Sequence, residues 1–244
     1  NISIQPSTIS EMNIKTAFLD KKDLYNIIPE RKKRTNKGSY GRLFIIAGSN
    51  DMTGAVALCC KGAFRAGAGL VYACTVQSGI NVVQQLVQEA VVMPLSEYDG
   101  KVRFECYKDE IEPKIKMASA VAVGPGLGMS DEVREFVKEI ITKVDAPLII
   151  DADGLNAITD DPSILLSLKH TPVITPHPGE MSRLTGMTVR EILDDTVNLA
   201  RDFAMKYNTV VVLKDARSVI AAPDGRVIIN ITGNPSMATG GSGD

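Results

Sequence analysis

The sequence predicts an α/β fold in which helices cover both faces of a mostly parallel central sheet. Short continuous apolar runs, as expected for strands buried on both faces, alternate with stretches whose apolar residues repeat at helical spacing. Strands that are separated by helices pair in parallel, which requires a three-layer α/β/α arrangement. A Pro-Asp-Gly-Arg turn at residues 223–226 adds a β-hairpin late in the chain.

The individual elements follow from these patterns in order along the chain. Residues 1–20 alternate weakly and contain Pro6, which indicates an edge strand followed by a linker. Buried strands are expected at residues 43–47, 70–75, 120–123, 148–150, 172–175 and 209–213, and hairpin strands at 218–222 and 227–231. Helical spacing predicts helices over 55–66 and 133–144 and one long amphipathic helix over 192–207.

Composition excludes several classes of protein. With 27 Lys and Arg residues against 29 Asp and Glu, the chain lacks the basic excess of a nucleic-acid binder. No run approaches the ~18 consecutive apolar residues of a membrane span, and the first residues resemble no signal peptide. The four cysteines fit no zinc motif, and Cys59 and Cys60 lie in an apolar segment. We therefore expect a cytoplasmic protein with thiols packed in its core and with no nucleic-acid or membrane partner.

Ligands of such sheets bind beyond the carboxyl ends of the strands, so the loops that follow the strands are candidate sites. Residues 48–55 combine small residues with a helix start whose N–H groups suit an anion, although ordinary turns give similar sequences. Residues 124–128 read Gly-Pro-Gly-Leu-Gly and leave backbone amides open to a substrate, without the dinucleotide-binding fingerprint. After the next strand, Asp151 and Asp153 can orient a substrate, join a Mg²⁺ shell or cap a helix.

Two further loops carry residues suited to chemistry. Pro176 and Pro178 hold His177 in an extended, exposed turn, where a neutral imidazole can donate to a ligand or simply face solvent. The glycine-rich run over residues 233–244 can turn successive backbone N–H groups towards an anion; a flexible linker is the alternative interpretation. Asp244 ends this run, where it can accept the proton of a substrate hydroxyl during phosphoryl transfer.

Together these segments resemble the ADP/ATP-dependent NAD(P)H-hydrate dehydratases, which have a ribokinase-like fold. The resemblance runs from about residue 20 to Asp244. Its motifs are Lys37-Gly38-Ser39-Tyr40-Gly41, Thr53-Gly54-Ala55, Arg65-Ala66-Gly67-Ala68-Gly69-Leu70-Val71, Gly124–Gly128, Asp151–Asn156, Thr175–Glu180 and Asn234–Asp244. One such motif alone would be weak evidence for the family, whereas the whole set in this order is specific to it.

The resemblance implies a repair enzyme that returns the S epimer of hydrated NADH or NADPH to the working cofactor. ADP or ATP would phosphorylate the C6 hydroxyl of the hydrated nicotinamide ring, and phosphate would then leave as the ring nitrogen supplies electrons. Mg²⁺ is expected, as in other phosphoryl transfers, although no metal-ligand constellation is recognisable in the chain.

Carried over residue by residue, the resemblance implies that Asp244 is the catalytic base at the hydrated ring. The hydrate-binding positions would be Ala55, Gly126, Gly128, His177 and Asp244. Gly241 and Gly243 would cradle the nucleotide phosphates, and the segment Lys214, Asp215, Ala216, Arg217 and Ser218 would line the nucleotide. Asp215 stands where the family often has glycine and adds a charge near the phosphates, so the choice between ADP and ATP stays open.

The resemblance also implies a domain organisation and partners. Residues 1–20 would be a linker or the tail of an NAD(P)H-hydrate epimerase domain on the same polypeptide, and residues 21–244 a dehydratase domain truncated at its C-terminus. A homo-oligomer, with a tetramer as one option, is expected.

Two other functions fit the same pattern. A ribokinase-like kinase of a small vitamin-precursor alcohol would share the sheet, the glycine-rich run and Asp244, and would release a stable phosphorylated product. A nucleotide-binding module would bind ADP or ATP without any turnover.

Overall fold

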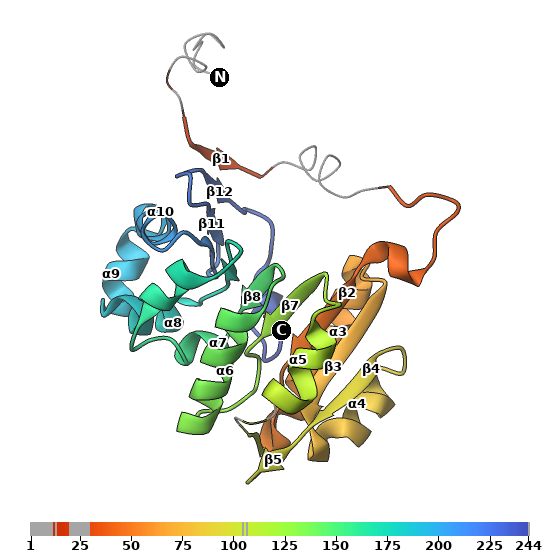
Figure 1. The fold of residues 1–244 in the computed structure, drawn as a ribbon. Coiled ribbons are helices and arrows are strands. Elements are labelled where there is room, and N and C mark those ends of the chain that lie inside the picture. Colours follow the sequence, from red (N-terminus) through yellow and green to blue (C-terminus); the bar gives the residue numbers. More distant parts are fainter. Residues whose placement is uncertain (1–11, 13, 20–29, 104, 106, 244) are drawn as a thin grey trace.

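One large sheet runs through the computed structural model, which describes residues 12, 14–19, 30–103, 105 and 107–243 (Figure 1). The described strands of this sheet lie in the order β1-β12-β11-β10-β9-β8-β7-β2-β3-β4. Their bounds are β1 Thr16–Phe18, β2 Arg42–Ile46, β3 Leu70–Val76, β4 Val91–Leu95, β7 Ala120–Val123, β8 Leu148–Ile150, β9 Val173–Ile174, β10 Val210–Leu213, β11 Val219–Ala221 and β12 Val227–Ile229. A separate hairpin consists of β5 (Glu97–Tyr98) and β6 (Lys101–Val102).

Helices and short helical turns connect these strands. The α-helices are α3 Thr53–Ala66, α4 Ile80–Leu86, α5 Glu112–Ile115, α6 Asp131–Lys143, α7 Asp153–Asn156, α8 Pro178–Thr185, α9 Val189–Asp194 and α10 Thr196–Lys206. Short 3₁₀ turns are η1 Lys37–Tyr40, η2 Asn50–Met52, η3 Gln77–Gly79, η5 Pro162–Ser167 and η6 Pro235–Met237, and the π-helical turn η4 covers Tyr107–Ile111. No helix in the described ranges is long and apolar enough to cross a membrane.

The sheet topology confirms the predicted fold class. Strands β2, β3, β4, β7, β8, β9 and β10 pair in parallel, whereas β11 is antiparallel to both β10 and β12. The β11–β12 pair is the predicted hairpin, and Gly225 takes a φ of 83° in its turn. β1 forms the predicted edge strand by pairing in parallel with β12.

The prediction of one long helix over residues 192–207 is wrong. The chain forms two helices, α9 and α10, which are separated at Asp195 (φ −147°, ψ 65°). The Asp195 carboxylate accepts a hydrogen bond from the Asn198 backbone N–H at 3.2 Å and so caps the start of α10. An N-cap residue has non-helical backbone angles, so α9 ends before Asp195 and α10 begins directly after it.

The core lies mainly on one face of the sheet. On that face Phe44, Val121, Ile150 and Val211 pack with apolar side chains of α6, α8, α9 and α10, including the fully buried Phe136. On the other face α3 and α4 cover β2, β3 and β4 with a smaller cluster around Ile45 and Val56. The buried Cys74 and Cys60 belong to the larger and the smaller cluster respectively, as predicted for core thiols; Cys106 lies outside the described residues.

Part of the second face is open in the described chain. The strand registers place five apolar residues, Ile149, Val173, Val212, Ile220 and Ile228, on the face that α3 and α4 cover farther along the sheet. They belong to neither buried cluster, and Ile149 is 37% exposed. Among the described residues, no helix covers this part of the second face.

Two of the sequence motifs serve the scaffold. The segment over residues 37–41 precedes β2, and the segment over residues 65–71 leads into β3. The two pack so closely that a Cβ on Gly69 would lie 1.9 Å from the carbonyl oxygen of Lys37. Gly69 N–H donates to the Tyr40 carbonyl at 3.0 Å, and Leu70 N–H donates to the Gly41 carbonyl at 3.1 Å. These motifs therefore join β2 to β3 at the amino ends of the strands, away from the loops at the carboxyl ends.

Candidate active site at the carboxyl ends of the strands

The loops that follow β2, β7 and β8 are joined by backbone hydrogen bonds. Gly48 N–H donates to the Pro125 carbonyl at 2.8 Å, and Gly124 N–H donates to the Ile46 carbonyl at 3.1 Å. A Cβ on Gly124, whose φ is 129°, would lie 1.8 Å from the Asp151 carbonyl oxygen. Only glycine allows the backbone at position 124 to come so close to the Asp151 carbonyl. This contact and the two hydrogen bonds bring three of the predicted site loops together.

Ala55 and Gly126, two predicted hydrate-binding positions, lie against each other. A Cβ on Gly126 would lie 2.9 Å from the Ala55 Cβ and 2.9 Å from the Met52 Cβ. Gly126 has a φ of 65°, so both space and backbone conformation require glycine. Ala55 lies in the first turn of α3, and no side chain caps that helix start. The site therefore combines a close backbone surface with a helix N-terminus, which suits a polar or anionic ligand.

Gly128 completes this side of the site. Its N–H donates to the Asp153 Oδ2 at 2.8 Å, and its φ is 84°. Asp153 begins α7, so the second carboxylate of the predicted pair orients the loop after β7. The predicted helix cap is not formed, because no side chain caps α7; Asp153 instead holds the loop after β7 in place.

His177 is both exposed and structurally engaged. It is the N-cap of α8, and its Nδ1 accepts hydrogen bonds from the backbone N–H groups of Gly179 at 2.9 Å and Glu180 at 3.3 Å. Because Nδ1 is an acceptor, a neutral ring carries its proton on Nε2. The buried Glu180 completes a capping box, because its Oε2 accepts a hydrogen bond from the His177 N–H at 2.8 Å. The half-exposed ring thus offers one N–H, at Nε2, for donation, 3.4 Å from the nearest oxygen of Glu180.

Lys214 and Asp151 form the charged centre of the site. The Lys214 Nζ lies 2.8 Å from the Asp151 Oδ1, which also accepts from the Thr175 hydroxyl at 2.6 Å. Asp151 is only 7% exposed, and the Lys214 N–H donates to the Pro176 carbonyl at 2.8 Å. The ends of β8, β9 and β10 are therefore tied together through one carboxylate. The sequence places Thr175 in the motif over residues 175–180 without indicating a role for it, although its place directly after a strand was a usable signal.

The glycine-rich run approaches this centre. A Cβ on Gly243 would lie 3.6 Å from the Lys214 Nζ, and Gly241 has a φ of 77°. Before it, Asn234 caps η6 by accepting from the Ser236 N–H at 3.0 Å. Asp244, the predicted base, lies outside the described residues. Two predicted nucleotide-binding residues, Lys214 and Gly243, are thus neighbours.

The remaining predicted nucleotide positions lie in an open bend. Asp215, Ala216 and Arg217 are exposed between β10 and β11. Ser218 is half-buried, and its carbonyl accepts from the Asn230 N–H at 2.9 Å, which joins the bend to the start of the glycine-rich run. The contacts among the described residues bring Lys214 to Gly243 but do not draw Asp215, Ala216 or Arg217 to it.

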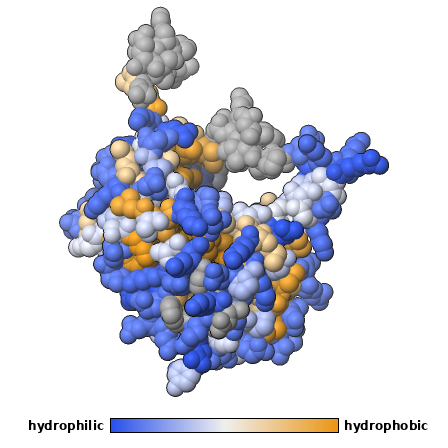
Figure 2. Space-filling view, in the orientation of Figure 1, coloured by the Kyte–Doolittle hydropathy of each residue, from blue (hydrophilic) through white to orange (hydrophobic). Residues whose placement is uncertain are grey.

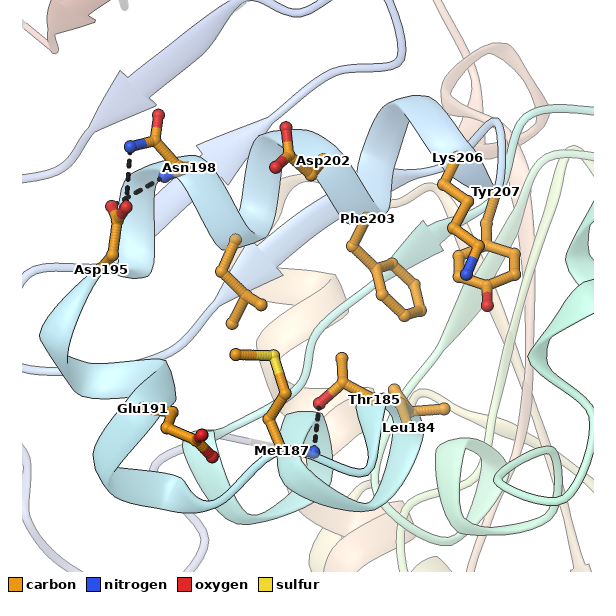
Figure 3. Close-up of a pocket in the computed structure, with 11 residues that line it drawn as sticks. Leu184, Thr185, Met187, Glu191, Asp195, Asn198, Asp202, Phe203, Lys206 and Tyr207 are labelled. Atoms are coloured by element: carbon orange, nitrogen blue, oxygen red, sulfur yellow. Dashed lines mark hydrogen bonds between the residues drawn. The ribbon is translucent and has the colours of Figure 1, made fainter.

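A separate hollow of about 440 Å³ lies between α8, α9 and α10 (Figure 3). Leu184, Met187 and Phe203 form an apolar part of its lining. In Figure 2 hydrophobic surface is visible on the side of the molecule where α8, α9 and α10 lie. Two of its three carboxylates, Glu191 and Asp195, accept hydrogen bonds in helix caps, with Thr188 and Asn198 as donors; the third is Asp202. Residues of these helices and their ends line this hollow, and none of the predicted site residues is among them.

Comparison with known proteins identifies the family. The family model for NAD(P)H-hydrate dehydratase matches residues 43–244. The ADP-dependent (S)-NAD(P)H-hydrate dehydratase of Bacillus subtilis is 36% identical over 219 residues, which are 89% of this chain and 73% of that protein. The bifunctional NAD(P)H-hydrate repair enzyme Nnr of Moorella thermoacetica is 39% identical over 217 residues, 89% of this chain and 41% of that protein. The chain thus spans about two-fifths of the length of such bifunctional relatives.

Solved structures agree with this match. The B. subtilis ADP/ATP-dependent NAD(P)H-hydrate dehydratase, co-crystallised with ATP and Mg²⁺, superposes with a TM-score of 0.77 at 33% identity, over 94% of this chain and 77% of that one. A ribokinase-like superfamily protein of Enterococcus faecalis gives a TM-score of 0.81 at 26% identity, over 94% of this chain and 76% of that one. The family match, these relatives and the shared ribokinase-like fold show that this chain belongs to the NAD(P)H-hydrate dehydratase family.

Proposed function

We propose that this chain catalyses the nucleotide-dependent dehydration of the S epimer of hydrated NADH or NADPH. The observation that carries the proposal is the placement of Lys214 between the buried Asp151 and Gly243, in a chain of this family. A lysine held against a glycine-rich run is the arrangement that phosphoryl transfer needs, since positioning and neutralised charge supply most of its catalysis.

The reaction divides the site into two halves. The hydrate would bind on the Ala55–Gly126 side, beside the uncapped start of α3, with Gly128 and the Nε2–H of His177 as further contacts. The phosphates of ADP or ATP would lie on the glycine-rich run beside Lys214, with Gly241 and Gly243 cradling them and the segment over residues 214–218 lining the nucleotide.

The proposed reaction has two steps, phosphoryl transfer to the hydrate and elimination of phosphate. Asp244 accepts the proton of the C6 hydroxyl as that oxygen attacks the terminal phosphorus, which releases AMP from ADP or ADP from ATP. The C6–O bond then breaks, phosphate leaves with the bonding pair, and the ring nitrogen supplies electrons to C6. Loss of a proton from C5 restores the double bond and gives NADH or NADPH. Phosphorylation is useful because phosphate is a far better leaving group than hydroxide.

The described residues offer no ready-made cage for Mg²⁺. No group of three or more His, Cys, Asp or Glu side chains lies close enough together in the described ranges to hold a metal ion. Asp151 is already engaged by Lys214 and Thr175. We propose that Mg²⁺ arrives on the phosphate oxygens of the nucleotide, since this ion is commonly bound through substrate phosphates and one or two carboxylates.

The natural polypeptide is proposed to be bifunctional, with an NAD(P)H-hydrate epimerase domain before this one. The support is that several relatives are called bifunctional NAD(P)H-hydrate repair enzymes and are more than twice as long as the matched region. The domain boundary near residue 20 and assembly into a homo-oligomer stay predictions.

The direct test follows recovery of the dihydronicotinamide absorbance near 340 nm in a mixture of hydrated NADH, Mg²⁺ and either ADP or ATP. The natural polypeptide that carries this sequence is used, with Asp244→Asn as the matched variant. We expect recovery that requires nucleotide and falls by about 10³-fold or more in the variant, as for loss of a general base that also positions the substrate. The same assay ranks ADP against ATP and hydrated NADH against hydrated NADPH.

Two outcomes would contradict the proposal. A stable phosphorylated product with no recovered absorbance would identify a small-molecule kinase. Nucleotide binding by a folded protein without any product would identify a binding module.

A further inference from the structure

The β5–β6 hairpin reaches the hydrate side of the site. Its turn is anchored on the loop after β2, because Asn50 N–H donates to the Gly100 carbonyl at 2.8 Å. A Cβ on Gly100 would lie 2.6 Å from the Asn50 Cβ, so the two loops are in close contact. In Figure 1, β5 lies at the lower end of the molecule, below α5. The hairpin therefore borders the surface that Ala55 and Gly126 begin.

Lys101, on this hairpin, lies beside a predicted hydrate-binding residue. A Cβ on Gly128 would lie 3.5 Å from the Lys101 Cε, 3.7 Å from its Cδ and 3.8 Å from its Cγ. The aliphatic part of the lysine thus lies beside Gly128. Lys101 also lines a pocket of about 390 Å³ together with Asn50 and Asp51.

The Lys101 ammonium makes no hydrogen bond or ion pair within the described part of the chain. Acidic side chains are near, since Asp51, Glu97 and Asp99 line the same pocket. Glu97 is engaged elsewhere, because its Oε2 accepts from the Ser78 hydroxyl at 2.8 Å and from the Ser78 N–H at 3.3 Å. Among the described residues Lys101 pairs with none of these three carboxylates, so this half-buried lysine beside Gly128 is available to an anionic group of the ligand.

Resting on the proposed function, we infer that Lys101 binds a phosphate group of the hydrated dinucleotide. The two lysines then divide the charge between the two ligands: Lys214 neutralises the nucleotide beside Gly243, and Lys101 neutralises the hydrate beside Gly128. The phosphate is either the diphosphate, which hydrated NADH and NADPH share, or the 2′-phosphate, which hydrated NADPH alone carries.

The test compares Lys101→Gln with the wild type in the dehydration assay, using hydrated NADH and hydrated NADPH in separate arms. We expect the KM for the hydrate to rise about ten-fold, as for one lost charge-assisted contact, while the KM for ADP and the melting temperature stay unchanged. Lys101→Arg should restore most of the affinity. The matched control is Lys143→Gln, which removes an exposed lysine at the end of α6 and should change nothing.

The outcomes separate this inference from the proposed function. An equal loss for both hydrates identifies the diphosphate, and a loss confined to hydrated NADPH identifies the 2′-phosphate. An unchanged KM for both hydrates, or a rise in the KM for ADP of the same size, overturns the inference and leaves the function standing. A wild-type protein without turnover overturns the proposed function, and this inference with it.

Discussion

The ammonium of Lys214 lies 2.8 Å from the carboxylate of Asp151, and the same carboxylate oxygen accepts from the Thr175 hydroxyl. Asp151 is nearly buried, whereas the Lys214 side chain is 30% exposed on the side of Gly243. The pair therefore has a fixed inner member and an outer member that faces the glycine-rich run. Asp151 holds the Lys214 side chain in position, and it links three strand ends to the lysine beside the glycine-rich run.

Asp151→Asn should weaken nucleotide binding and destabilise the fold. The amide cannot hold the Lys214 ammonium by a charge-assisted hydrogen bond, so Lys214 loses its fixed position beside Gly243. We therefore expect the KM for ADP to rise about ten-fold and the free energy of unfolding to fall by about 2 kcal/mol. Steady-state kinetics and urea denaturation measure the two effects. The matched control is Asp160→Asn, which removes an exposed ion pair with Lys138 and should cost at most about 0.5 kcal/mol. A lower KM for ADP in Asp151→Asn would instead mean that Asp151 competes with phosphate for Lys214.

Two substitutions of His177 should separate its cap from its ligand contact. His177→Ala removes the acceptor of the Gly179 and Glu180 N–H groups and should cost about 1 kcal/mol of stability, as for other lost N-caps. His177→Asn restores a good capping side chain but lacks the Nε2–H. We expect the melting temperature of His177→Asn to match that of the wild type, and its kcat/KM for the hydrate to be lower than that of the wild type. Full activity in His177→Asn would show that the ring only caps α8.

Gly126→Ala should damage both stability and hydrate binding. The added Cβ would lie 2.9 Å from the Cβ atoms of Ala55 and Met52, at a residue with a φ of 65°. We expect a loss of about 1–2 kcal/mol from the backbone conformation and a raised KM for the hydrate. Gly54→Ala is the control for stability, because its Cβ has open space in α3 and should stabilise the helix by up to about 1 kcal/mol. Thermal unfolding distinguishes the two variants.

Two core thiols make stability depend on alkaline pH. Burial raises the pKa of Cys60 to about 12, and burial, followed by the neighbouring Cys60, raises the pKa of Cys74 to about 12, against an ordinary value of 9.0. The folded state therefore favours the neutral thiols, and the unfolded state releases their protons more readily. Their contribution to stability is complete below about pH 9 and is lost as the pH rises towards 12.

The measurement is urea denaturation at pH 7.5 and pH 10.5. We expect the wild type to lose more stability between these two pH values than the variant with both Cys60→Ala and Cys74→Ala. Lysine and tyrosine titrate in both proteins, so only the difference between the two losses reports on the thiols. Equal losses in the two proteins would contradict the prediction.

Most strands of the main sheet were predictable because they are short, apolar and followed by a turn signal. The prediction missed β4, which contains Pro94, and the hairpin strands β5 and β6, which have only two residues each. Parallel strands covered by helices need side chains that tolerate burial on both faces, and such runs stand out in the sequence. The helix break at Asp195 was not predictable from periodicity, because the apolar spacing of α9 continues into α10. Asp195 was the relevant signal, but in the sequence an aspartate that caps a helix cannot be distinguished from an aspartate on the polar face of a continuous helix.

The motifs could be found in the sequence, but their roles could not be sorted there. The run over residues 37–41 and the run over residues 65–71 are as specific as the loops of the site, yet they join β2 to β3 at the opposite end. Gly69 is needed against a carbonyl oxygen of the scaffold, and Gly126 is needed beside Ala55. Glycine is required for the same steric reason in both places, so only the tertiary structure distinguishes them.

The sequence by itself determined the α/β class, most strands of the main sheet, the hairpin of β11 and β12 and the order of the site loops, because these depend on local periodicity and turn chemistry. The tertiary structure decided which side chains meet. The contact of Lys214 with Asp151 spans 63 positions, and the contact of Lys101 with Gly128 connects a separate hairpin to a loop of the main sheet. Such pairs are set by strand order and by how closely the loops approach one another, and neither is encoded in the pattern of a single segment.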